Sequence, residues 1–98
     1  MKIENVKPNS ILKKIKSKGK IPTELYKMRK NLFGSELDFI QQEYNSSFFE
    51  GMKVLVQDIN VPMNYLIVSP VDIPLDELRY KRPYYILYGF FLSDWKEV

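Results

Sequence analysis

The sequence predicts an α+β domain in which two or three N-terminal helices pack on one face of a small three-stranded antiparallel sheet. Apolar residues in the first half of the chain recur at the spacing of one helix face. The second half contains β-branched and aromatic runs separated by proline-containing links, as strands do. Helices followed by strands favour segregated layers. The 98 residues suffice for one domain, so we expect a basic arm or helix over 1–20 and a single α+β domain over 21–98.

The first expected helix lies near the N-terminus. Residues 9–10 (Asn-Ser) can cap it, Ile11, Leu12 and Ile15 form a narrow apolar strip, and Gly19 ends it. A helix that is short and rich in like charges is marginal alone, so it must dock on the body or order on a partner. The lysines around the strip are Lys13, Lys14, Lys16, Lys18 and Lys20.

Two more helices are expected before the strands. The first begins at Thr23 and ends at Gly34, and the second begins at Ser35 and ends at Gly51. Each has apolar residues at positions i, i+3 and i+7, which favours a core-facing stripe. These residues are Leu25, Met28 and Leu32 in the first helix, and Leu37, Ile40 and Tyr44 in the second.

Arg29 falls in the middle of the apolar face of the helix that begins at Thr23. Two interpretations remain open. The arginine can snorkel past the edge of the core, with its charged end in water. Alternatively, it is a contact residue on a binding surface, because arginine is enriched among interface anchors.

Three strands are expected after the helices. Residues 52–58 and 63–69 form a hairpin, with Pro62 at a strand edge. Residues 69–83 read as a loop with one helical turn near residues 74–79. The third strand, residues 84–92, has apolar side chains on both faces, so it is either central or covered by helices or a partner.

Charge is distributed unevenly along the chain. Residues 1–30 contain ten basic and two acidic residues, whereas residues 31–98 contain five basic and ten acidic ones. This asymmetry indicates either contact with phosphate or an acidic surface, or a solvated lysine-rich segment that pairs with the acids of its own chain. The chain also has no alanine and twelve lysines against three arginines. Such usage is typical of an AT-rich genome and suggests a bacteriophage, virus or mobile element.

The residue types present argue against catalysis. The chain has no cysteine and no histidine, which excludes disulfides, thiolate sites, the commonest general base and the commonest zinc ligand. Residues 94–96 (Asp-Trp-Lys) fit the acid-x-lysine pattern of a nuclease core, but a solvated C-terminal tail anchored by Trp95 explains them better. The acids at residues 72–77 match no calcium loop. We therefore expect a non-enzymatic protein with no cofactor and no metal.

The favoured function is a protein-binding accessory factor of phage or mobile-element type, either an inhibitor of a host protein or a virion assembly component. A nucleic-acid-binding protein that uses its basic N-terminal arm is the alternative. The expected partner contacts, chosen as aromatic and arginine anchors with their neighbours, are Arg29, Tyr80, Lys81, Arg82, Tyr84 and Tyr88. In the alternative, phosphate contacts come from Lys13, Lys14, Lys16, Lys18 and Lys20.

The partner is therefore expected to be a host or viral protein, with nucleic acid as the other possibility. No apolar run reaches the ~20 residues that a membrane helix needs, and no secretory signal is recognisable, so we expect a cytoplasmic or virion location without membrane contact. The two apolar faces of the third strand leave a homo-oligomer open.

Overall fold

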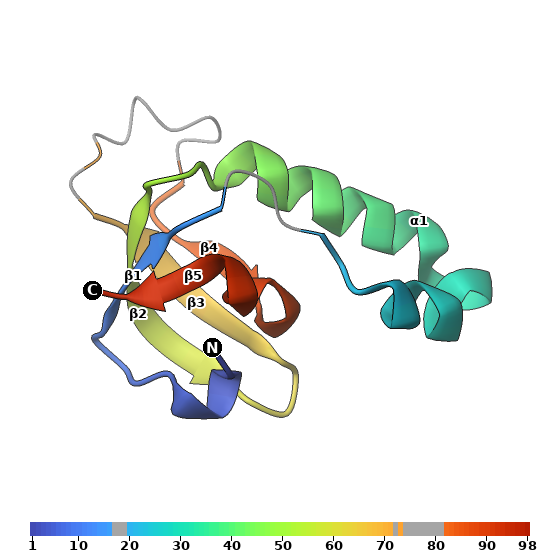
Figure 1. Cartoon of the computed structure of the whole chain (residues 1–98), viewed down its shortest axis with the longest axis horizontal. Coiled ribbons are helices and arrows are strands. Elements are labelled where there is room, and N and C mark those ends of the chain that lie inside the picture. The colour runs from blue at the N-terminus through green and yellow to red at the C-terminus, as the bar shows by residue number, and fades with distance from the viewer. Residues whose placement is uncertain (17–19, 72, 74–81) are drawn as a thin grey trace.

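The computed structural model describes residues 1–16, 20–71, 73 and 82–98, without the side chains of residues 26–35. It shows an antiparallel sheet with one long helix on one side (Figure 1). The elements in chain order are η1 (Ile3–Asn5), β1 (Ile11–Lys14), α1 (Thr23–Ser47), β2 (Lys53–Asn60), β3 (Tyr65–Pro70), β4 (Tyr85–Tyr88), η3 (Gly89–Asp94) and β5 (Trp95–Glu97), where η denotes a 3-10 helix.

The sheet contains five strands in the order β4-β3-β2-β1-β5, and each neighbouring pair is antiparallel. The prediction of a three-stranded sheet under two or three N-terminal helices is therefore wrong. In the part of the chain that the structure describes, α1 is the one α-helix, and it is inserted between β1 and β2 instead of preceding all strands.

Residues 11–14 form β1 where a helix was predicted. Their burial alternates, with Leu12 and Lys14 buried and Ile11 and Lys13 half-buried, which is the period of a strand. Apolar residues at 11, 12 and 15 fit either period over so short a segment. Residues 11–14 form a strand because they pair with β2 on one side and with β5 on the other. This pairing satisfies the backbone N–H and C=O groups along both edges of β1.

Helix α1 runs through Gly34 and Ser35, so the predicted break between two helices is wrong. A glycine inside a helix costs about 1 kcal/mol relative to alanine, which weakens a helix without ending it. The helix ends at Ser47, where the Phe48 amide donates to the Tyr44 carbonyl at 3.0 Å. Gly51, the predicted end, instead takes a φ of 89° in the turn that leads to β2.

The predicted hairpin of residues 52–58 and 63–69 is confirmed as β2 and β3, which pair antiparallel. The predicted strand over 84–92 is wrong in its second half, because β4 ends at Tyr88 and η3 follows. The last residues form β5 beside β1 and are no solvated tail. The helical turn expected near residues 74–79 lies outside the described residues.

The sheet curls around Phe48. The ring of this residue lies 5.6 Å from that of Tyr85 on β4 and 5.5 Å from that of Trp95 on β5, centroid to centroid. These strands are the two edges of the sheet and, in a flat sheet, would be about 19 Å apart at a spacing of ~4.8 Å per strand. One ring touches both edges, so the sheet must roll strongly around the residue that follows α1.

A buried polar network fixes the end of α1 to β1 and β5. Lys14 Nζ donates to the Phe48 carbonyl at 2.7 Å and lies 4.6 Å from the centre of the Tyr44 ring. The Tyr44 hydroxyl donates to Asp94 Oδ2 at 2.8 Å and accepts from Trp95 Nε1 at 3.0 Å. Burial lowers the pKa of Lys14, and the nearby Asp94 carboxylate opposes that shift. Burial and the bond to Asp94 both raise the pKa of Tyr44.

Candidate protein-binding groove

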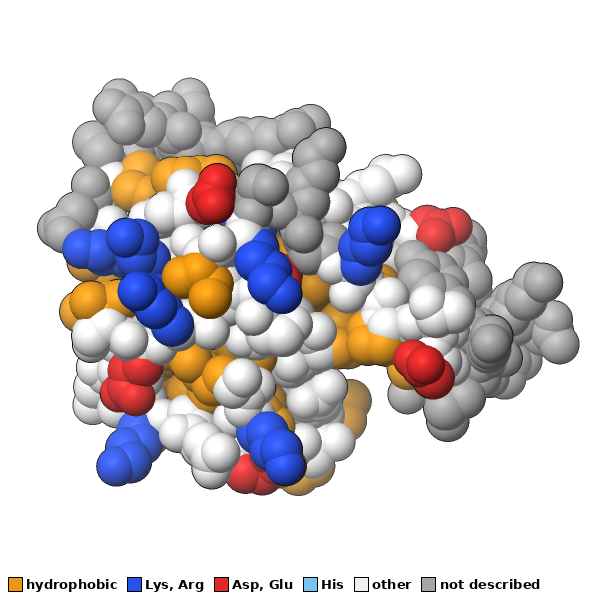
Figure 2. Space-filling model, viewed as in Figure 1, with side chains coloured by type: hydrophobic (Ala, Val, Ile, Leu, Met, Phe, Trp, Pro, Cys, Tyr) orange, Lys and Arg blue, Asp and Glu red, His pale blue; other side chains and the backbone are white. Residues whose placement is uncertain are grey.

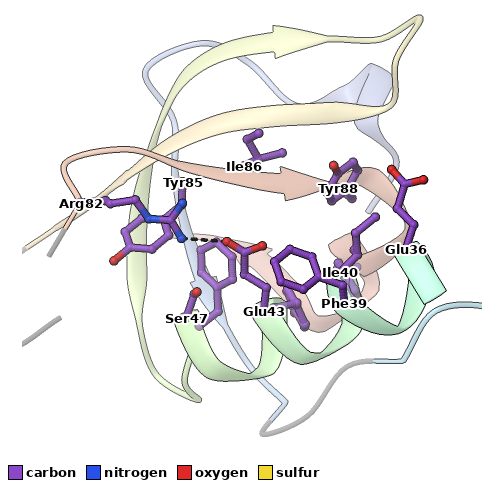
Figure 3. A pocket seen from close by; sticks show the side chains of 12 residues that line it. Glu36, Phe39, Ile40, Glu43, Ser47, Arg82, Tyr85, Ile86 and Tyr88 are labelled. Carbon is purple, nitrogen blue, oxygen red and sulfur yellow. Dashed lines mark hydrogen bonds and ion pairs between the residues drawn. The ribbon is translucent and has the colours of Figure 1, made fainter. Parts of the chain in front are cut away.

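A groove separates β4 from the second half of α1 (Figure 3). Its floor is aromatic, since the rings of Tyr44 and Phe91 stack 3.6 Å apart beneath it and Phe48 closes one end. The hollow measures about 200 Å³. Small-molecule sites occupy roughly 300–1,000 Å³, so the space suits one or two side chains of a longer ligand better than a whole substrate.

A second hollow continues the groove along α1. It shares Glu36, Ile40 and Tyr88 with the first and extends past the first turn of α1 at Leu25 to the β2–β3 turn at Met63. The two hollows are therefore neighbours along α1, with Tyr88 lining both. Adjacent hollows can each take a side chain of one extended segment.

Strand β4 forms one wall and is an edge of the sheet. Among the described strands it pairs with β3 alone, from Val68–Tyr85 to Tyr65–Tyr88. Alternate N–H and C=O groups of an edge strand point away from its neighbour and are available to another strand. The wall therefore offers main-chain donors and acceptors beside the apolar floor.

Large apolar side chains are exposed at this groove. Phe39 on α1 is 63% exposed and Ile86 on β4 is 51% exposed, and both line the first hollow. Tyr84, directly before β4, is 56% exposed. Single exposed apolar residues need no explanation, but a contiguous set around a depression marks an interaction surface.

The rim of the groove on α1 carries two carboxylates, Glu36 and Glu43. Arg82 Nη2 lies 2.8 Å from Glu43 Oε1, and its guanidinium lies 5.1 Å from the centre of the Tyr85 ring. The pKa of Tyr88 is raised by burial first and then by the negative charges of Glu36 and Glu43. Glu36 and Glu43 therefore place negative charge on the α1 rim of the groove, and the charge of Glu43 is paired with Arg82.

Ser47 lies at the Arg82 end of the groove (Figure 3). Its hydroxyl is buried, and within the described part of the chain it has no hydrogen-bond partner. A buried polar group without a partner costs about 1–3 kcal/mol. A polar group entering this end of the groove would recover part of that cost.

Three of the six predicted partner contacts lie at this place. Arg82 stands at one end of the groove, Tyr84 precedes its β4 wall, and Tyr88 joins its two hollows. Arg29 lies in α1, but its side chain is not described. Tyr80 and Lys81 lie outside the described residues.

The lysines predicted to contact phosphate are separated by the fold. Lys13 points outward from β1, and Lys16 and Lys20 are exposed. Lys14 is fully buried, so its prediction as a phosphate contact is wrong, because strand alternation turns it into the core. Lys18 lies outside the described residues.

Sequence reasoning did not identify Glu36, Phe39, Glu43, Ser47 or Ile86 as site residues. Phe39 carried a usable signal, because it falls outside the apolar stripe of its helix and a large aromatic there is exposed by default. The others carried none. These residues come together only because α1 packs beside β4, and no local sequence pattern indicates that long-range contact.

The described residues contain no cluster of three or more metal-binding side chains. Within the same residues, no helix has the length and hydropathy that a bilayer crossing requires. Comparisons with protein-family models, with curated proteins and with solved structures found no match. The function is therefore argued from the geometry of this chain.

Proposed function

We propose that this protein is a protein-binding module that accepts an extended segment of a partner between β4 and α1. The observation that carries the proposal is an open edge strand that faces a helix across an apolar groove. Addition of a strand to a sheet edge is a recurring mode of peptide recognition, in which main-chain hydrogen bonds give affinity and side-chain pockets give specificity.

The partner segment has a predictable chemistry. Its apolar side chains fill the hollows floored by Phe48, Tyr44 and Phe91 and cover the exposed Phe39. Glu36 is exposed and, among the described residues, forms no ion pair, so a lysine or arginine of the partner is favoured beside it. Alternate residues of an extended segment point to opposite sides, so apolar and basic residues should alternate.

The composition-based hypotheses about biological context stay predictions. They are a phage or mobile-element source, a role as inhibitor of a host protein or as virion component, and a cytoplasmic location. A partner from a host or a virion would bind the same groove.

The test is selection of binders from a random peptide library displayed on phage, followed by titration of synthetic peptides with the purified protein. We expect enriched peptides to alternate apolar residues with lysine or arginine. Each enriched peptide is then remade with single N-methylated residues. Loss of one main-chain hydrogen bond should weaken binding about tenfold at alternate positions and leave the intervening positions unchanged.

Two charge-reversal variants supply the matched control. Glu36→Lys reverses the charge of a carboxylate that lines the groove, so peptides with an acidic residue should replace those with a basic one. Glu24→Lys makes the same charge change in the first turn of α1, at a residue that lines neither hollow, and should leave the selected sequences unchanged. Absence of enriched peptides, or equal loss at every N-methylated position, would refute strand addition.

A further inference from the structure

Three lysines lie side by side across the face of the sheet that points away from the core. Lys13 of β1 is directly opposite Lys53 of β2 and also directly opposite Lys96 of β5. Residues opposite each other in an antiparallel sheet project to the same face. One chain neighbour of each lysine is buried: Lys14 follows Lys13, Val54 follows Lys53, and Trp95 precedes Lys96. Because side chains alternate along a strand, the three lysines lie on the outer face.

We call Lys53, Lys13 and Lys96 the lysine row. Figure 2 shows basic side chains gathered over the part of the molecule where Figure 1 places β1, β2 and β5. Opposite residues have Cβ atoms about 4.5–5.5 Å apart, and like charges at that separation destabilise a sheet. None of the three lysines forms an ion pair with an acid in the described part of the chain.

Among the described residues, no carboxylate is therefore paired with the positive charge of the row. By contrast, the ammonium group of Lys14 donates a hydrogen bond to the Phe48 carbonyl. A bound anion would remove the repulsion within the row and gain attraction from three ammonium groups at once. This arrangement favours a ligand with several negative charges in a line.

We propose that the lysine row binds the phosphates of a nucleic-acid duplex, independently of base sequence and separately from the proposed groove. Two strand spacings place the outer lysines about 10 Å apart. Each of the three flexible lysine side chains can reach one phosphate of the duplex backbone, so the row can make up to three phosphate contacts. A line of charges fits this ligand better than it fits a membrane surface, which attracts a two-dimensional basic patch.

The side chains around the lysine row favour contact with the phosphate backbone of the duplex over contact with its bases. Ile11 and Leu55, opposite each other beside the row, are aliphatic and half-buried. The one aromatic residue of β1, β2 and β5 is Trp95, whose side chain is buried. Single-strand binding relies on aromatic rings that stack bases, and the outer face of these three strands carries none.

The test measures binding of a fluorescein-labelled duplex of about 30 base pairs by anisotropy between 50 and 200 mM salt. Three phosphate contacts predict a slope of log affinity against log salt of about −2.7. Replacing Lys13, Lys53 and Lys96 together by Gln should reduce affinity at 50 mM salt at least tenfold, with a slope near zero. Removal of like-charge repulsion should leave the folded state as stable as before, which urea unfolding checks.

The matched control replaces Lys2, Lys7 and Lys20, three exposed lysines outside the row, by Gln. It lowers the net charge by the same amount and should change affinity less than threefold. Equal losses in the two variants, or no binding of the duplex by the natural protein, would overturn the proposal. Binding to vesicles of phosphatidylcholine and phosphatidylserine without binding to the duplex would also overturn it, in favour of a lipid surface. Peptide binding by the groove is measured on the same variants, so failure of one site is distinguished from failure of the other.

Discussion

The groove between β4 and α1 and the lysine row on β2, β1 and β5 present opposite kinds of surface on one small sheet. In the groove, apolar side chains such as Phe39 and Ile86 are exposed, and the charge of Glu43 is already paired with Arg82. In the row, the charges have no ion-pair partner among the described residues, and the nearby apolar residues are half-buried. The groove is suited to recognition by shape and main-chain hydrogen bonds, and the row to recognition by charge.

The difference follows from position in the sheet. Among the described strands β4 pairs with β3 alone and is an edge, so one side of its main chain can pair with a partner, whereas β1 is paired on both sides and offers side chains alone. A sheet edge gives directional hydrogen bonds, and a sheet face gives a pattern of side chains. The two surfaces should therefore respond differently to substitution, salt and pH.

The largest expected effect concerns the residue on which both surfaces depend. Phe48→Ala removes the ring that touches β4 and β5, and loss of a buried phenylalanine costs about 3–5 kcal/mol. Urea unfolding of the variant measures this loss. Phe49→Ala is the control, because Phe49 is half exposed and should change stability by less than about 0.5 kcal/mol. A loss below about 1 kcal/mol for Phe48→Ala would contradict the rolled sheet.

The next effect separates the two faces of β1. Lys14→Met leaves the buried Phe48 carbonyl without its 2.7 Å donor and should destabilise the fold by about 2 kcal/mol. Lys13→Met removes a charge from the lysine row and should leave the stability unchanged or raise it by a few tenths of a kcal/mol. Urea midpoints of the two variants give the comparison. Equal effects would mean that β1 does not alternate between core and surface as described.

Salt should distinguish the two binding activities. A slope of about −2.7 predicts that duplex binding by the lysine row falls about 40-fold, or roughly 2 kcal/mol, between 50 and 200 mM salt. Peptide binding in the groove depends on main-chain hydrogen bonds and apolar contact, so we expect a change of less than about threefold over the same range. Titrations of both ligands on one protein sample provide the measurement. A strong salt dependence of peptide binding would show that charge also dominates the groove.

The last effect builds up gradually with pH and concerns the tyrosine beneath the groove. The pKa of Tyr44 is raised above its ordinary value of 10.0 in the folded protein, so above pH 10 the unfolded chain releases this proton first. Stability should therefore fall with rising pH, by about 1.4 kcal/mol per pH unit from this group alone. The difference in unfolding free energy between the natural protein and Tyr44→Phe is measured by urea from pH 9 to about pH 11.5; it should stay nearly constant below pH 10 and shrink at that rate above it. A constant difference would show that the hydroxyl does not stay protonated on Asp94.

Several features of the fold were predictable before any coordinates. The β-branched runs and the turn between them predicted β2 and β3, because period-two patterns and turn residues are local signals. The same reasoning placed α-helix over most of residues 23–47, although it divided the helix at Gly34. Local signals failed for β1 and β5, which contain four and three residues, because segments so short fit more than one period.

The amino-acid composition already sets the limits of the chemistry: the absence of histidine and cysteine, the uneven charge, and the aromatic residues at 84–88 that belong to the β4 wall. The tertiary structure alone decided which of these residues meet. Lys13 and Lys14 are neighbours of identical type, yet one joins Lys53 and Lys96 on the surface while the other is buried against Tyr44. The physical reason is that strand register and the packing of α1 are long-range contacts, and these assign each side chain to the core, the groove or the outer face.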